Sequence, residues 1–272
     1  MKPLVLTLRA RPEQRLDLSP LVPHRLAGKT ADEIMRLALN TTRRGICVGD
    51  VFRLRMGEAN SIRIEGDGNR LDMVGHEMRD GEIVVDGDVG IQAGRLMSGG
   101  RLLISGSAGP WAASGMKGGQ LQIAGSVGDR LGGPLAGEMA GMRGGVVLVN
   151  GDAGDRAGDR MRRGTIIIEG KAGAHVGSRM IAGTLVVRRA AGALPGYLMR
   201  RGTIVLGVGC TEPLPTFVDS GTHDLVAMRL MAAFVSTLSA RAAGLFRAPL
   251  RRFAGDMAVL GKGEILVANR GG

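Results

Sequence analysis

Histidine, cysteine and serine build many catalytic and metal sites, and in this chain they are scattered. The four histidines show none of the HxH, HxxxH or HExxH spacings that bring two imidazoles to one metal. They are His24, His76, His175 and His223. No serine stands in a G-x-S-x-G elbow, and neither cysteine has a histidine close to it in sequence. We therefore expect no catalytic residue and no metal site on this chain.

Two glycine-rich stretches look like nucleotide-binding motifs but depart from them. Five residues separate Gly255 from Gly261, where a phosphate loop has four. Gly263 then stands where Ser or Thr would hold magnesium. The segment that begins at Gly207 opens no helix, so it lacks the context of a dinucleotide-binding turn. We expect no cofactor bound by this chain alone.

Arginine dominates the charged residues. The chain has 272 residues and a formal net charge of +11, and only five of its 36 basic residues are Lys. Arginines that directly follow a recurring Met would form a row if copies of the repeat stacked, although Ile181 interrupts it. Such a row attracts anions, or it only keeps a solvated face charged; both interpretations stay open. The candidate anion-binding residues are Arg143, Arg162, Arg163, Arg200 and Arg201.

These residues belong to a repeat of 19 residues between Met78 and Cys210. One copy is longer by seven residues. The Met residues that head the copies are Met78, Met97, Met116, Met142, Met161, Met180 and Met199. Three residues after each Met stands Gly, apolar residues follow at the fifth and seventh positions, and a small apolar residue follows at the eleventh.

Alternating apolar residues indicate a strand, and glycines at fixed positions allow the turns between strands. A 19-residue unit is too short to bury a face by itself, so it must stack on its neighbours. We predict an all-β fold, a right-handed parallel β-helix of about seven coils over residues 59–211, with Met and aliphatic side chains inside. A sandwich of hairpins is the alternative, but it does not require the same residue at every nineteenth position.

The segments on either side of the repeat differ in composition. Residues 1–58 are expected to form a cap or docking arm with a strand at 4–8 and a short helix at about 31–40, capped by Thr30 and Glu33. Residues 212–272 begin with a proline-rich linker at 212–215. We expect a helix there, capped by Ser220 or Thr222, with an apolar stripe from Leu225 to Val235, and a final strand at 265–267.

The longer copy carries an insertion around residues 132–141, GGPLAGEMAG, which should project from one corner of the stack. Trp111, the only Trp, stands where other copies have polar or small residues, so it either anchors an interface or packs under the insertion. A surface excursion without function is an equal alternative for the loop. The candidate partner-interface residues are Trp111, Pro134, Leu135 and Met139.

Composition limits the cellular compartment and the kinds of partner that we expect for the chain. Cys47 and Cys210 show no CxxC spacing, which favours free thiols in a reducing compartment. No signal peptide is evident, and the apolar run at 225–235 is too short to span a bilayer. We expect a cytoplasmic protein. Seven aromatic residues and no recognition helix argue against a nucleic-acid partner.

The repeat headed by Met and the ending with Gly255-Asp256 and Gly261-Lys262-Gly263-Glu264-Ile265 resemble the GXGXG repeat family. This family includes the C-terminal domain of glutamate synthase and the C subunit of formylmethanofuran dehydrogenases. Length and ending are more similar to the dehydrogenase subunit. Because the chain is rich in Arg and poor in Lys, the resemblance extends most closely to the C subunit of the bacterial formyltransferase/hydrolase complexes.

The resemblance implies a non-catalytic structural subunit of an enzyme complex. Such a complex passes a formyl group from formyl-tetrahydromethanopterin to a methanofuran-type carrier and releases formate, in one-carbon metabolism and formaldehyde oxidation. It implies three partners, namely an amidohydrolase-like hydrolase subunit, a chain like the B subunit of the dehydrogenase, and a formyltransferase subunit. The carrier has a glutamate-containing tail, which the arginine row would attract.

Three other functions stay open at this level. The first alternative is the C subunit of a redox formylmethanofuran dehydrogenase. The second is a glutamate-synthase-like accessory that positions a flavin or iron–sulfur partner. The third is a free-standing module that binds anions. Hydrolytic and redox complexes differ in ligands on other chains, so this sequence does not separate them.

Overall fold

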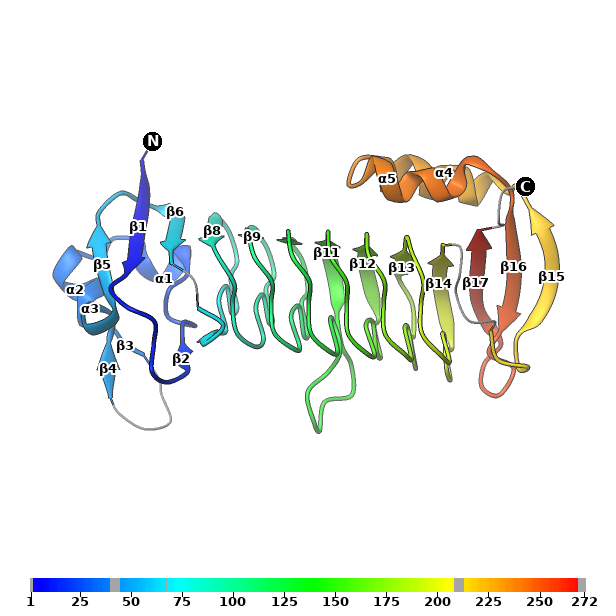
Figure 1. Ribbon diagram of the computed structural model, residues 1–272, viewed down its shortest axis with the longest axis horizontal. Helices are drawn as coiled ribbons and strands as arrows, with labels where there is room; N and C mark the ends of the chain where they lie inside the picture. The colour runs from blue at the N-terminus through cyan, green and yellow to red at the C-terminus, as the bar shows by residue number, and fades with distance from the viewer. Residues whose placement is uncertain (1, 40–44, 67, 208–212, 269–272) are drawn as a thin grey trace.

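In the computed structural model, which describes residues 2–39, 45–66, 68–207 and 213–268, the chain is mostly β (Figure 1). Within these ranges one mixed sheet of 13 strands runs along the elongated molecule. In sheet order the strands are β15 (Val218–His223), β16 (Leu250–Gly255), β17 (Lys262–Ala268), β14 (Arg201–Leu206), β13 (Thr184–Val187), β12 (Arg163–Ile168), β11 (Arg143–Val149), β10 (Gln120–Ile123), β9 (Arg101–Ile104), β8 (Glu82–Asp86), β6 (Glu58–Glu65), β1 (Pro3–Leu8) and β5 (Phe52–Arg55).

The predicted repeat sets the register of the central strands. From β6 through β8 to β14, each strand pairs in parallel with the next, and the apolar positions of successive copies lie opposite each other, as in Ile83↔Leu102 and Ile166↔Leu185. Parallel pairing rules out a sandwich of hairpins. The small residues at the eleventh position also bridge from copy to copy, from Val89 to Ala191. Cys210, the last of them, lies outside the described residues.

The interior is filled as the sequence predicts. Every repeated Met from Met78 to Met199 has no exposed surface, and the aliphatic residues of the strands lie beside them. Successive turns of chain approach closely where Gly stands. A Cβ on Gly100, whose φ is +75°, would lie 2.7 Å from the backbone oxygen of Asp80. The glycines therefore set how tightly one turn stacks on the next.

The N-terminal segment continues the sheet. β1 lies between β6, which it pairs in parallel, and β5, which it pairs in the antiparallel sense. Helices α1 (Pro23–Leu26), α2 (Ala31–Met35) and α3 (Val48–Val51) accompany two small pairs, β2 (Leu16–Asp17) with β7 (Leu71–Asp72) and β3 (Ala38–Leu39) with β4 (Ile46–Cys47). The capping box of Thr30 and Glu33 is confirmed. The helix ends at Met35, earlier than predicted, because the chain then pairs as β3; residue 40 lies outside the described residues.

The C-terminal segment closes the other end. β17 adds to β14 in parallel, and β16 and β15 follow in the antiparallel sense. Helix α4 (Val226–Ser236), helix α5 (Ala240–Ala243) and the 3-10 helix η1 (Gly244–Arg247) lie along one side of the sheet (Figure 1). Met228 and Val235 of α4 pack in one apolar cluster with Ile167, Val186 and Val205 of the strands.

One prediction for this segment is wrong. Ser220 and Thr222 do not cap the helix; they belong to β15, and α4 starts after Leu225 without a side-chain cap. Strand β16, which the sequence pattern does not predict, forms because the edge of β17 takes a partner for its backbone groups. The predicted final strand is confirmed as part of β17. Within the described ranges, none of the helices is long and apolar enough to cross a membrane.

Candidate functional site: the inserted loop and a basic groove

The insertion leaves the stack as one loop between β10 and β11 (Figure 1). Its base is closed by backbone hydrogen bonds. The N–H of Met142 donates to the oxygen of Gly132 at 2.6 Å, and the N–H of Gly141 donates to the oxygen of Arg160 at 3.0 Å. The loop thus enters and leaves through one narrow neck. The predicted projection at residues 132–141 is confirmed.

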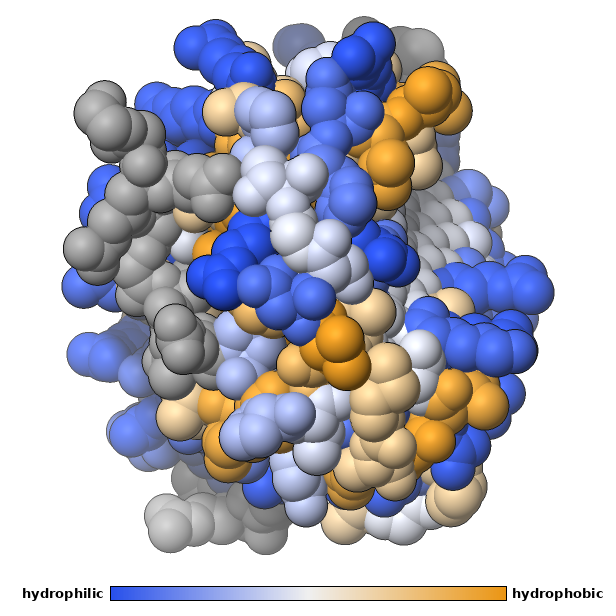
Figure 2. Space-filling view, turned by 90° about the vertical axis from the view of Figure 1, so that its right-hand side faces the viewer, coloured by the Kyte–Doolittle hydropathy of each residue, from blue (hydrophilic) through white to orange (hydrophobic). Residues whose placement is uncertain are grey.

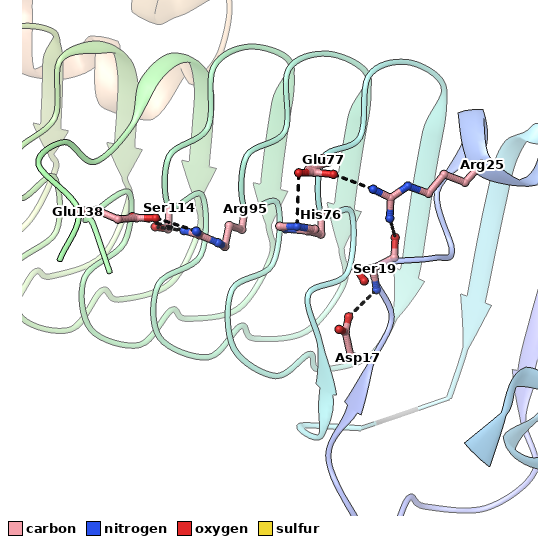
Figure 3. Close-up of polar contacts among 8 residues, drawn as sticks. All are labelled: Asp17, Ser19, Arg25, His76, Glu77, Arg95, Ser114 and Glu138. Carbon is pink, nitrogen blue, oxygen red and sulfur yellow. Dashed lines mark hydrogen bonds and ion pairs between the residues drawn. The ribbon is translucent and has the colours of Figure 1, made fainter. Parts of the chain in front are cut away.

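Glu138 fixes the loop against the stack. Its carboxylate accepts a hydrogen bond from Arg95 Nη2 at 2.7 Å (Figure 3). It accepts another from the N–H of Leu135 at 2.9 Å, and Arg160 Nη1 donates to the backbone oxygen of Glu138 at 3.1 Å. Arg95 is 13% exposed and also donates to Ser114. The hydrogen bond from Arg95 holds the pKa of Glu138 below its usual value. Sequence reasoning missed Glu138, although it is the only charged residue of the insertion.

A second set of polar contacts continues along the same flank toward the N-terminal segment (Figure 3). Arg25 of α1 bridges the backbone oxygen of Ser19 and the carboxylate of Glu77 at 2.6 Å from Nη2. His76 Nε2 lies 3.9 Å from Glu77 Oε1, and burial lowers the pKa of the His76 imidazole. These contacts join residues 1–58 to the first turn of the repeat, so the cap and the stack hold together partly by charge.

Replacing Glu138 with Gln is expected to lower the free energy of unfolding by about 1 kcal/mol at neutral pH, because a partly screened charge-assisted hydrogen bond is lost. The pKa of Glu138 is lower in the folded than in the unfolded chain, so its contribution is present above the unfolded value and is lost as the pH falls through the folded value. Urea titrations of both proteins, repeated in acid, measure this. If the difference in free energy of unfolding between the two proteins stays constant down to roughly pH 3, the stabilising role of the Glu138 carboxylate is contradicted.

Of the predicted interface residues, Pro134, Leu135 and Met139 line one shallow hollow of the inserted loop, and Trp111 does not line it. Pro134 is buried, Leu135 is half-buried, and Met139 at the outer part of the loop is 75% exposed. Trp111 is half-buried at a corner with a φ of 60°, and its buried Nε1 finds no hydrogen-bond partner among the described residues. Of the four, Met139 offers the most free apolar surface.

Met139 borders a groove that is closed at the far side by the β16–β17 turn. The groove has a volume of about 280 Å³. Its lining residues are Met139, Arg160, Arg162, Arg179, Ile181, Leu198, Arg200 and Val259. Three backbone hydrogen bonds of 2.8 Å lie along it. In each, a backbone N–H donates to the carbonyl oxygen of the Met that heads the preceding copy: Arg162 to Met142, Ile181 to Met161 and Arg200 to Met180. These three residues therefore stand on successive turns, and strand spacing puts the two arginine backbones about 10 Å apart.

The arginines of the groove differ in how they are paired. Arg179 is held by Asp159, whose side chain has no exposed surface. Arg160 donates to the backbone of Glu138. Arg162 and Arg200 are exposed, and no carboxylate of the described residues lies within ion-pair distance of either. These two side chains carry the exposed positive charge of the groove, and the half-buried Arg160, which is bonded to a backbone oxygen, adds a third positive charge.

The predicted arginine row is thus divided. Arg162 and Arg200 line the groove with Ile181 between them, as the spacing predicts. Arg143, Arg163 and Arg201 are exposed at strand starts and do not line it. Sequence reasoning missed Arg160 and Arg179, which directly precede Met161 and Met180. Their identical offset in two adjacent copies is the signal that could have found them.

The groove offers guanidinium donors next to apolar side chains, a combination that can bind an anionic group with an apolar part. In the described residues, no group of three or more His, Cys, Asp or Glu side chains gathers as a metal would require. Fold and groove together define a class of protein: an elongated β repeat protein with a basic groove on one flank.

Comparisons with known proteins give the family. The chain is 54% identical to the C subunit of the formyltransferase/hydrolase complex Fhc of Methylorubrum extorquens over 96% of this chain and 98% of that protein. The crystal structure of the FhcABCD complex from Methylorubrum extorquens, solved with methylofuran, contains a chain that matches with a TM-score of 0.94 and 46% identity over 98% of this chain and 100% of that one. This chain belongs to the family of Fhc C subunits, which confirms the resemblance.

A more distant relation is also present. The C subunit of tungsten-containing formylmethanofuran dehydrogenase 2 of Methanothermobacter wolfeii is 31% identical over 99 residues, which is 35% of this chain and 37% of that protein. No family profile matches the chain.

Proposed function

We propose that this chain is the structural subunit of a formyltransferase/hydrolase complex. The complex would pass the formyl group of formyl-tetrahydromethanopterin to a methanofuran-type carrier and release formate. The single observation that carries this is the 54% identity to the Fhc C subunit over 98% of its length. A redox dehydrogenase is less well supported, since that similarity covers only 35% of the chain.

The fold suits a scaffold. We infer a right-handed parallel β-helix of about seven coils over residues 59–211, with a cap at 1–58 and a closing segment at 212–272. The continuous parallel pairing from β6 to β14, and the bridges every copy from Val89 to Ala191, support this description. An interior filled by Met and aliphatic side chains leaves the outer surface for partners. The partners are the hydrolase subunit, the chain like the dehydrogenase B subunit and the formyltransferase subunit, in the cytoplasm.

Affinity purification tests this proposal. A tagged chain is expressed with the other subunits, isolated at low ionic strength, and its co-eluting proteins are identified by mass spectrometry. We expect all three partners in a fixed ratio, and formate release from the formylated carrier by the isolated complex. Elution of the chain alone would overturn the proposal. Co-elution of an iron–sulfur or tungsten protein would favour the redox alternative instead.

The groove is proposed to attract the glutamate-containing tail of the carrier. Replacing Arg162 and Arg200 together with Gln is expected to raise the KM for the carrier several-fold at low salt. The two exposed charges contribute about 0.5 kcal/mol each to binding, and about 1.4 kcal/mol of binding free energy corresponds to a tenfold change in affinity. The matched control replaces Arg163 and Arg201, which removes equal charge outside the groove. Equal effects of both pairs, or no effect in an intact complex, would remove the groove from carrier binding.

A further inference from the structure

Helix α4 is apolar on two opposite faces. Its inner face packs on the sheet, with Met228 and Val235 buried. On its outer face Val226 is 70% exposed, Leu230 is 68% exposed and Phe234 is 47% exposed. These three residues are spaced by four and so form one line along the helix, the α4 outer ridge. A helix that needs only to cover the sheet would carry polar residues there.

The side chains beside the ridge are small or paired in charge. Ala227 and Ala233 are exposed beside it, and they leave the three large side chains projecting. Arg229, the only charged residue of α4, is neutralised by Asp224, with Nη2 and Oδ2 2.6 Å apart. An apolar ridge without net charge beside it, on a chain with a formal charge of +11, suits insertion into an apolar groove. A helix that lies on a membrane surface would instead carry free Lys or Arg on its flanks.

The size of the ridge decides between two occupants. Burying one large apolar side chain contributes about 1.5–3 kcal/mol, and each Å² of apolar surface removed from water contributes about 25 cal/mol. One such side chain therefore removes roughly 100 Å² of surface from water. Three partly exposed side chains therefore offer a few hundred Å², whereas a stable interface takes about 800 Å² per partner. An 11-residue helix paired with its own copy falls short of that area. The ridge suits one element of a larger interface.

We propose that the α4 outer ridge inserts into an apolar groove on another protein subunit of the complex. The inference rests on the proposed function in that the chain works among other subunits. In Figure 1, α4 lies on the side of the sheet opposite to the inserted loop, so a partner on the ridge leaves the basic groove free. Figure 2, which views the C-terminal end, shows apolar surface toward the α4 side and again in the lower half, with charged side chains between.

The test replaces Val226, Leu230 and Phe234 together with Ser in the chain co-expressed with its partner subunits. The control replaces Met257 and Leu260 with Ser, which are 51% and 48% exposed in the β16–β17 turn. We expect the triple variant to keep its circular dichroism spectrum and its Tm within a few degrees, and to lose one subunit from the complex in native mass spectrometry. Affinity for that subunit should fall by at least about tenfold, since buried apolar anchors carry most binding energy. The control should retain every subunit.

Each other outcome overturns the inference. An intact complex with the triple variant shows that the ridge contacts no partner. A dimer of the isolated wild-type chain that the triple variant abolishes assigns the ridge to a second copy. Co-sedimentation of the wild-type chain with phosphatidylserine vesicles, lost in the variant, assigns it to a membrane surface. If the wild-type chain recovers no subunit at all, the proposed function fails first and the ridge inference fails with it.

Discussion

Replacing Gly144 with Ala is expected to destabilise the stack by more than about 3 kcal/mol, among the largest effects of any single substitution. A Cβ at this position would lie 2.2 Å from the backbone oxygen of Lys117 and 3.0 Å from its carbonyl carbon. Both atoms belong to the preceding turn of chain, so no side-chain rotation relieves the overlap. The two turns must separate, and the parallel hydrogen bonds between β10 and β11 separate with them.

Gly244 supplies the matched control for this substitution. A Cβ there meets no heavy atom within 4 Å, and the residue has helical backbone angles, with φ of −57° and ψ of −24°. Gly244→Ala should therefore leave the stability unchanged or raise it by about 0.4–1 kcal/mol through the unfolded chain. Urea denaturation followed by circular dichroism measures both variants. Equal stabilities for the two would mean that the turns are not packed as closely as described.

Replacing Met161 with Ala is expected to cost about 2–5 kcal/mol, the usual range for removing a large buried side chain. Met161 has no exposed surface. Its methyl group reaches the next turn of chain, where it lies 2.9 Å from the place that a Cβ on Gly183 would occupy. Neighbouring turns are hydrogen-bonded to each other and cannot collapse into the cavity. Met161→Leu keeps most of the volume and should cost less than about 1.5 kcal/mol.

Met139→Ala is the control for the methionine series, because this side chain is 75% exposed. Its stability should change by less than about 0.5 kcal/mol. Thermal and urea unfolding of the three variants measures the contrast. A loss at Met139 as large as that at Met161 would show that burial of the repeated methionines does not stabilise the stack.

The repeat could be predicted because each copy imposes the same requirement. A strand that pairs in parallel with an identical neighbour must keep its apolar residues in register, so the sequence period reports the pairing directly. The ends of the stack have no such period. β15 and β16 extend the sheet beyond the edge of β17. Helix α4 packs in one apolar cluster with Ile167 and Val186, and the local residues around Ser220 do not signal this packing.

The candidate site was predictable in part for the same reason. Arg162 and Arg200 share one position of the repeat and line one groove. Arg163 and Arg201 stand one residue later, where alternate side chains of a strand point to the opposite face. The walls of the groove come from Met139 and Val259, which are 120 residues apart and meet only through tertiary structure.

The most direct test of the central claim is the rate of formate release in a complex assembled from separately purified subunits, with and without this chain. We predict that the chain alone releases no formate from the formylated carrier. Added to the other subunits, it should raise the rate at which formyl groups delivered by the transferase leave as formate. At saturating concentrations of free formylated carrier, where binding in the groove no longer limits the rate, it should leave hydrolysis unchanged. Formate release by this chain alone, or an equal coupled rate without it, would contradict a scaffold that carries no reaction centre.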